Sequence, residues 1–320
     1  MRDPILIGAV TIVVISGALS TLEALGRPNI GFEMDGTHQV RVVRPGSPAQ
    51  AAGVQSGDVL KSVNSILITD TKKMEVVYLE AGGLAPGTYS FERGGQTVDV
   101  EIQRGSLSTR QFALVLAATF IGLVFVGLPI WAYFTAPGTP TVLLAVFGLA
   151  FGSTIMGAPT FESPAIRIAA FNMMWLLALL GAAALLHFLL TFPSPVRLVA
   201  RWRATILYVP VAMLVFTSGR SMRIMLWGLA FLGLYLLAGV IALLWRYLGA
   251  TSAERTAHGL RLMLVSVIVV GALLPVYLAL ARAWPTIWLP WESFALTATV
   301  LIPIGFSRAV VRSATNGLRG

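Results

Sequence analysis

Residues 111–134 read QFALVLAATFIGLVFVGLPIWAYF, a run that stays apolar for a whole helix length. A helix needs about 20 predominantly apolar residues to cross the hydrocarbon core of a bilayer. Later runs of the same kind are approximately residues 141–158, 166–192, 204–217, 224–245, 260–281 and 294–311. Together with an apolar run after the N-terminus, they predict an α-helical polytopic membrane bundle of about eight transmembrane helices.

The composition also places most of the chain in lipid. Of the 320 residues, 56% are hydrophobic and 12% are charged, whereas soluble domains carry about 25% charged residues. The net charge is +9, and much of the basic excess lies beside apolar runs, which indicates contact with anionic lipid headgroups and no nucleic-acid partner. There is no cysteine, so disulfides, thiol nucleophiles and cysteine-ligated metal centres are excluded.

The first apolar run, residues 5–19, has two interpretations. Ala18-Leu19-Ser20 could serve as a signal-peptidase site, but apolar residues continue to Leu25, which favours an uncleaved anchor at residues 1–26. Either interpretation exports residues 27–105. Most arginines of the later loops then lie on the side of the N-terminus, although Arg220 and Arg223 do not. We expect a multi-pass protein of the bacterial inner membrane, with a seven-helix bundle at residues 106–312, a cytoplasmic N-terminus and a cytoplasmic tail at 313–320.

The exported segment has the pattern of a small soluble α+β domain inserted after the first helix. Short alternating runs separated by turn residues predict mainly strands. Short helices are expected at about residues 48–52 and from 70 or 71 to 81. The runs 87–92 and 96–102 are joined by Arg93-Gly94-Gly95, which predicts a hairpin because glycine permits positive φ.

Several short motifs of this segment recur in the order and spacing of a known family. They are Asn29-Ile-Gly-Phe32, Val42-Val43, Pro45-Gly-Ser-Pro-Ala49, Ala52-Gly53, Gly57-Asp58-Val59 and Val63-Asn64. The segment resembles the PDZ domains of bacterial envelope proteins, with Ser65 where that family usually has glycine. The resemblance implies that an extended peptide pairs with an exposed sheet edge and that backbone amides hold its terminal carboxylate.

The resemblance also assigns the residues of this peptide site. They are a carboxylate loop at Asn29, Ile30 and Gly31, a receiving edge that begins at Phe32, Glu33 and Met34, and a facing helix with Met74, Val77, Tyr78 and Ala81 on one face. The two methionines would form an adaptable apolar pocket, which predicts loose preference for hydrophobic chain ends. Alternatively, Phe32, Val77 and Tyr78 are core residues, and the module is a spacer, a dimer interface or a degenerate domain.

The membrane segments contain few polar or ionisable side chains that could serve transport or catalysis. Asn172 and His187 are the internal polar candidates, whereas pumps need buried ionisable relays, so no transporter is expected. Gly148 and Gly152 form a Gly-x-x-x-Gly pair, which predicts close helix packing. No zinc-protease or serine-hydrolase motif is present, and the three histidines fall on separate segments. We therefore expect no enzyme, no cofactor and no metal site.

Residues 185–195, 254–264 and 301–312 are similar to parts of the multi-helix sensor region of ComP-type histidine kinases, a family that also carries a PDZ-like module after its first helix. That family continues into a phosphorylatable histidine helix and an ATP-binding domain, whereas this sequence stops at Gly320. The resemblance therefore implies a sensor region without the kinase domains.

These patterns lead to a functional expectation and an alternative. The expectation is a non-catalytic membrane receptor or adaptor that binds protein or peptide termini outside the membrane and signals or docks through its helix bundle. The alternative is a structural accessory or scaffold subunit of a larger integral complex of respiratory or photosynthetic type, and a chaperone-like helper is a weaker idea. The expected partners are chain termini, other integral membrane proteins and lipid.

Overall fold

The computed structural model describes residues 4–26, 30–34, 37–68, 87–103, 105, 109–159, 161, 164–195, 201–217, 222–283 and 296–317. Its contacts divide the chain into two compact units. One consists of Met1–Thr21 with Leu116–Gly320, and the other of Leu22–Val115. The first unit is helical, and the second carries the strands. The domain boundaries expected from the sequence stay predictions.

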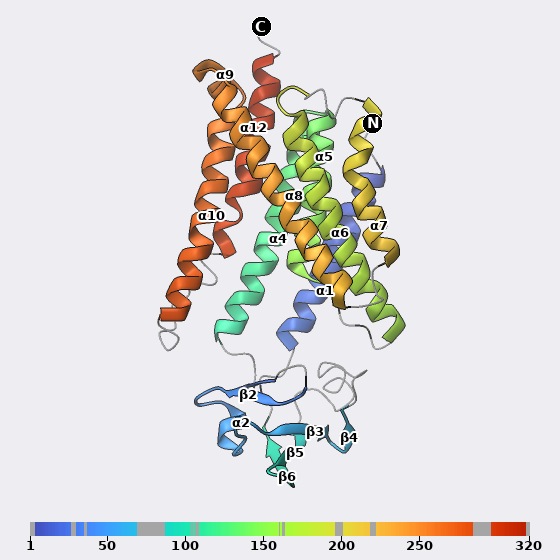
Figure 1. Cartoon of the computed structure of the whole chain (residues 1–320), viewed down its shortest axis with the longest axis vertical. Helices are drawn as coiled ribbons and strands as arrows, with labels where there is room; N and C mark the ends of the chain where they lie inside the picture. The colour runs from blue at the N-terminus through green and yellow to red at the C-terminus, as the bar shows by residue number, and fades with distance from the viewer. Residues whose placement is uncertain are drawn as a thin grey trace. The chain divides into compact units, whose positions relative to one another are not determined.

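The helical unit is built from long helices and a few short ones (Figure 1). They are α1 (Pro4–Gly26), α4 (Thr109–Thr135), α5 (Thr139–Met156), α6 (Pro164–Thr191), the 3-10 helix η2 (Arg201–Tyr208), α7 (Val209–Thr217), α8 (Met222–Gly249), α9 (Ser252–Ala257), α10 (Leu260–Ala283) and α12 (Leu301–Gly317). Large apolar side chains lie on the outside of several helices, among them Ile5 at 81% exposed and Leu248 at 73%. Such helices fit a lipid environment, because they are apolar on all faces.

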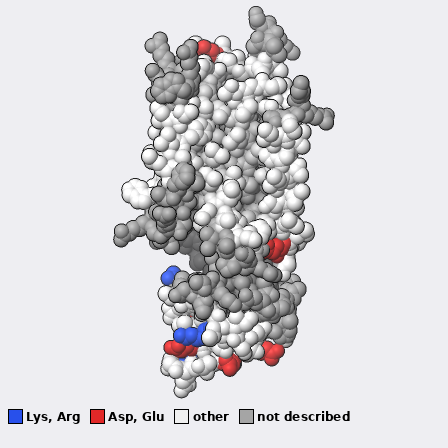
Figure 2. Space-filling view, turned by 90° about the vertical axis from the view of Figure 1, so that its right-hand side faces the viewer, with Lys and Arg blue, Asp and Glu red and all other residues white. Residues whose placement is uncertain are grey.

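Six helices of the described residues are long and apolar enough to cross a membrane. They suggest a multi-pass membrane protein, while the expected count of about eight spans is not confirmed. The run at 204–217 is divided between η2 and the nine-residue α7, and its apolar helical stretch, Ala204–Met213, is short. On the face that Figure 2 shows, the described surface of the helical unit is mostly free of charged residues, whereas that of the strand-bearing unit carries both signs.

The helices pack around a cluster of aromatic and aliphatic side chains. Phe147, Phe188 and Phe306 are each at most 2% exposed and come from α5, α6 and α12. Their neighbours Phe125 and Leu243 bring α4 and α8 to the same cluster. The core of this unit therefore joins helices that are far apart in the sequence, from α4 to α12.

The glycine pair of α5 lies against α4. A Cβ atom on Gly148 would lie 2.3 Å from the carbonyl oxygen of Phe125, and one on Gly152 would lie 2.8 Å from that of Gly122. No side chain fits at such distances, so the two helices approach backbone to backbone. The close packing predicted from the Gly-x-x-x-Gly spacing is confirmed.

The strand-bearing unit contains two small antiparallel sheets among its described residues. Strand β1 (Phe32–Met34) pairs with β2 (Val40–Val43). The second sheet has the strand order β4 (Ile66–Leu67), β3 (Val59–Val63), β5 (Gly87–Arg93) and β6 (Gln96–Ile102). The short helix α2 (Pro48–Ala51) follows β2, as predicted. The helix expected at residues 70–81 lies outside the described residues.

The turn between β5 and β6 is the predicted hairpin. Gly94 and Gly95 have φ values of 57° and 83°, which is the left-handed backbone that a two-residue turn of this kind requires. Along β5, Gly87, Tyr89 and Phe91 are buried on one face. Tyr89 and Phe91 pack with Leu60, Val63 and Ile102 in the core of this unit.

Candidate functional site

The candidate peptide site lies along β1. Within the described residues β1 has a partner strand on one side, β2. The backbone N–H of Arg44 donates to the carbonyl of Gly31 at 2.8 Å, and Phe32 pairs with Val43. This arrangement makes Phe32 and Val43 a non-hydrogen-bonded pair, so the N–H and C=O of Phe32 point away from β2. These two groups can pair with an added strand.

The loop before β1 is held by the connection between β2 and α2. The carbonyl of Ile30 accepts a hydrogen bond from the N–H of Ala49 at 2.9 Å. The carbonyl of Gly31 accepts from Arg44 and also from the hydroxyl of Ser47 at 3.2 Å. Both carbonyl oxygens are therefore turned into the unit, where they would not repel an incoming carboxylate.

Glycine is required at position 31 for two reasons. Its φ is +84°, and a Cβ atom there would lie 2.1 Å from the Cβ of Ser47. Ser47 is itself fixed, because its hydroxyl caps α2 by accepting from the N–H of Gln50 at 3.3 Å. The close contact between Gly31 and Ser47, the N-cap of α2, thus fixes the conformation of the loop before β1.

The side chains of the predicted edge serve the core. Phe32 is 9% exposed, and its ring meets Tyr89 and Phe91 edge to face, with centroids 6.2 Å and 5.8 Å apart. Ile30 is 8% exposed, and Met34 packs against the same cluster. Phe32 can therefore be a core side chain and still offer its backbone to a peptide, so the two interpretations of this residue are compatible.

The remaining predicted site residues lie outside the part of the chain that the structure describes. Asn29, Met74, Val77, Tyr78 and Ala81 lie outside the described residues, as does the side chain of Glu33. The structure brings together Ile30, Gly31, Phe32 and the backbone of Glu33 and Met34. The assignment of all ten residues to one peptide site stays a prediction.

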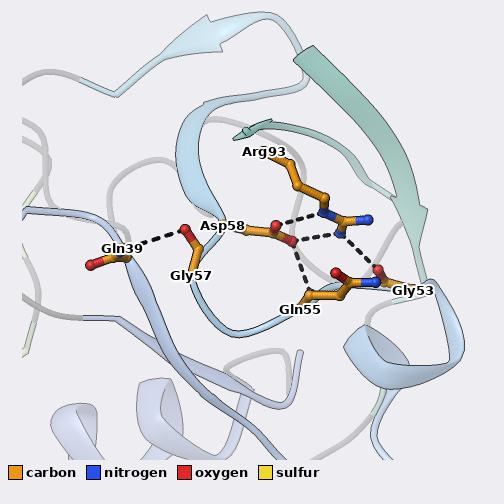
Figure 3. Close-up of polar contacts among 6 residues, drawn as sticks. All are labelled: Gln39, Gly53, Gln55, Gly57, Asp58 and Arg93. Carbon is orange, nitrogen blue, oxygen red and sulfur yellow. Dashed lines mark hydrogen bonds and ion pairs between the residues drawn. The ribbon is translucent and has the colours of Figure 1, made fainter. Parts of the chain in front are cut away.

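Sequence reasoning missed an ion pair that stabilises the unit. Figure 3 shows Arg93 at the end of β5 reaching the carboxylate of Asp58. Its Nε donates to Oδ1 at 2.7 Å, and its Nη2 donates to Oδ2 at 2.7 Å and to the carbonyl of Gly53 at 2.9 Å. Asp58 is 1% exposed. Signals for this pair were the Gly57-Asp58 motif and the arginine directly before Gly94.

Hydrogen bonding governs the electrostatics of this pair. The bonds from Arg93, and after them the one from the N–H of Gln55 at 2.9 Å, lower the pKa of Asp58 below its ordinary value, although burial alone would raise it. The same carboxylate raises the pKa of Arg93. Both groups are therefore charged at neutral pH, and they connect the β5–β6 hairpin to the turn before β3.

The histidines of the helical unit serve other contacts. His187 Nδ1 lies 3.1 Å from the hydroxyl of Tyr208, and His258 Nδ1 lies 2.7 Å from that of Ser313. Among the residues that the structure describes, no group of three acidic or histidine side chains could hold a metal ion.

An arginine closes the end of α6. Arg246 of α8 donates from Nη2 to the carbonyl of Leu190 at 2.9 Å and to that of Ser194, and from Nη1 to the hydroxyl of Ser194 at 3.1 Å. The last carbonyls of a helix have no partner within it. Arg246 supplies a hydrogen-bond donor to the carbonyl of Leu190 near the end of α6, and so joins α6 to α8.

Comparison with known proteins gives one match. Residues 39–79 match the family model described as a PDZ domain. The curated proteins and the solved structures give no match to this chain, so the similarity to ComP-type sensor regions has no support from relatives. The matched segment begins after β1 and includes residues 69–79, which the structure does not describe. The chain therefore combines a segment that matches the PDZ domain, a type of domain that generally binds peptide termini or proteins, with several apolar helices.

Proposed function

We propose that this protein is a non-catalytic membrane receptor or adaptor. Its PDZ-like module binds the end of a protein or peptide chain, and its helix bundle signals to, or docks on, other membrane proteins. The observation that supports this proposal most is the edge of β1 that has no partner strand among the described residues. There the backbone groups of Phe32 point away from β2, beside a glycine loop whose carbonyls are turned inward.

The ligand follows from the chemistry of this edge. An extended peptide adds as a strand, and its main-chain hydrogen bonds supply affinity. The loop at residues 29–31 receives the terminal carboxylate. Met34, together with Met74 and Val77 of the expected helix, lines an apolar pocket for the last side chain. We propose free, hydrophobic C-termini as the preferred ligands.

The proposed orientation uses the arginines of the helical unit. The start of α1 and the end of α12 lie at the same end of this unit (Figure 1). At that end, Asn316 of α12 donates to the carbonyl of Ala257 at 3.0 Å, so Arg255 and Arg312 lie there too. Basic residues favour the cytoplasmic side. We therefore propose cytoplasmic termini in a bacterial inner membrane and a periplasmic module at residues 27–105.

Peptide binding to the full chain in detergent tests the function. We expect peptides with a free carboxylate and an apolar last residue to bind, and amidation to weaken binding about tenfold or more, since hydrogen bonds to a charged group contribute about 1.5–3 kcal/mol. Equal binding of amidated and free peptides, or a preference for acidic ends, would contradict the proposed site.

A glycine pair provides the matched variants. Gly31→Ala should weaken binding, because its Cβ collides with Ser47 and the loop must move. Gly46→Ala should leave binding unchanged, since Gly46 has a similar φ of +71° but nothing lies within 4 Å of its Cβ position. Hydrogen exchange over β5 and β6 shows whether both variants are folded. If both folded variants bind like the unchanged protein, the loop is not the carboxylate site.

Native purification addresses the role of the bundle. A receptor or adaptor should be recovered free of fixed partners in mild detergent. Constant co-purification with other integral subunits would instead favour the scaffold alternative.

A further inference from the structure

The helical unit contains a partly open apolar cavity of about 610 Å³. Its lining comes from α4, α5, α6, α8, α10, α12 and the segment that leads into α12. Phe125, Phe147, Leu189, Leu243 and Phe306 form much of the wall. This volume falls within the range of about 300–1,000 Å³ that is usual for small-molecule sites.

The lining offers almost nothing for a polar ligand. Among its described residues the single polar side chain is Thr299, whose hydroxyl donates to the carbonyl of Leu296 at 2.5 Å. None of the described residues of the wall carries a charged side chain. A polar headgroup placed inside would lose its hydrogen bonds to water without replacement, and an apolar cavity does not hold ordered water either.

One part of the wall is open. Ile121 and Phe306 are each 1% exposed, whereas Leu296 is 44% exposed. A ligand can therefore place an apolar part inside and leave its polar end outside, near Leu296. A chain of methylene groups would also restore the dispersion contacts that the wall atoms lack on their cavity side.

We propose that this cavity binds one flexible hydrocarbon chain, with the headgroup outside the cavity. The chain could belong to a membrane phospholipid or to a free fatty acid, because the lining recognises the methylene chain that both share. This binding site is separate from the peptide site and does not depend on the proposed function.

Two glycines of the lining keep space for this chain. At Gly271 of α10, nothing lies within 4 Å of the position that a Cβ atom would take, and at Gly239 of α8 the nearest atom to that position is Leu189 Cδ1 at 3.1 Å. Position 271 lies in the cavity lining, and the Cβ atom of a larger side chain there would collide with no neighbouring atom. Gly233 of α8 also has nothing within 4 Å but is not among the lining residues, so it provides a matched control.

Photocrosslinking of the full chain tests the proposal. The protein is placed in nanodiscs that contain phosphatidylglycerol with a photoactivatable acyl chain or, in a second arm, photoactivatable palmitic acid. We expect labelling of lining residues such as Phe125, Leu189 and Leu243. Gly271→Leu should reduce this labelling about tenfold, because the leucine side chain would take space that the hydrocarbon chain needs. Gly233→Leu should not reduce the labelling.

The two arms distinguish the sources. Labelling from the phospholipid alone identifies a lipid site, and labelling from palmitic acid identifies a fatty-acid site. The proposal is overturned if neither probe labels the lining, if labelling is confined to residues outside the cavity, or if Gly271→Leu and Gly233→Leu are labelled equally. Thermal melting of both variants verifies that they are folded.

Discussion

Arg93 donates two hydrogen bonds of 2.7 Å to the buried carboxylate of Asp58 and so fixes the β5–β6 hairpin against the turn before β3. Removal of the guanidinium leaves a carboxylate that is 1% exposed without its cation. We expect Arg93→Met to destabilise the module by about 3 kcal/mol, because an unpaired buried charge is strongly unfavourable. Hydrogen exchange of β5 and β6 in the full chain measures the change.

The exposed ion pair between Lys61 and Glu92 provides the control for this variant. Its atoms are also 2.7 Å apart, but the side chains are 50% and 46% exposed. Water screens such a pair, so Lys61→Met should change stability by less than about 1 kcal/mol. Equal losses in the two variants would mean that burial of Asp58 has no special role.

The same pair predicts a dependence on pH. The pKa of Asp58 is lowered in the folded chain, chiefly by its hydrogen bonds from Arg93, from an ordinary value near 3.8. The folded state therefore binds this proton less readily than the unfolded state. The stabilisation is fully present above the ordinary pKa and is lost as pH falls through the lowered one.

Denaturant unfolding of the module, monitored by hydrogen exchange, should show this loss as the pH falls below the ordinary pKa near 3.8. In Asp58→Asn the module should be less stable at pH 7 and should lose less additional stability over the same pH range. If the variant keeps the full pH dependence, another carboxyl group is responsible.

The turn between β3 and β4 predicts a stabilising substitution. Asn64 and Ser65 have φ values of 48° and 65°. Asn64 accepts from the N–H of Thr88 at 2.8 Å through its side chain and tolerates this backbone conformation. Serine is strained there, so Ser65→Gly should stabilise the module by about 0.5–1 kcal/mol.

Ser65→Ala distinguishes backbone strain from loss of the hydroxyl. Alanine retains the Cβ atom and should bring no gain in the denaturation midpoint. If both variants stabilise the module equally, the strain argument fails. Ser65 stands where the PDZ family usually has glycine. The test therefore also shows whether serine at this position changes anything beyond the geometry of the turn.

Local chemistry explains what could be predicted from the sequence. Gly94 and Gly95 predicted their own turn, and the long apolar runs predicted helices able to cross a membrane, because each signal is contained in a short segment. Residues 204–217 were expected as one span. Pro210 lies at the second position of α7 and cannot donate the hydrogen bond that a continuous helix needs, which accounts for the division of this run.

The ion pair and the cavity depend on contacts between distant segments. The pairing of Val59 with Glu92 places Asp58 beside Arg93, and a shift of the strand register would separate them. The cavity depends on the packing of several helices, and its lining residues have the same apolar character as residues that face lipid. Composition alone therefore predicts neither feature.

The contact between α4 and α5 predicts a large effect from one methyl group. In Gly148→Ala the added Cβ would lie 2.3 Å from the carbonyl oxygen of Phe125 and 2.6 Å from Cγ of Pro129. The backbone of α4 cannot rotate away as a side chain could, so the helices must separate. We expect a loss of about 1–3 kcal/mol, measured as a lower thermal midpoint of the full chain in detergent.

Gly127→Ala, on α4, is the matched control, because nothing lies within 4 Å of its Cβ position and alanine favours the helix. Its midpoint should be unchanged or higher. If Gly148→Ala is as stable as Gly127→Ala, the backbone contact between these helices does not contribute to the stability of the bundle.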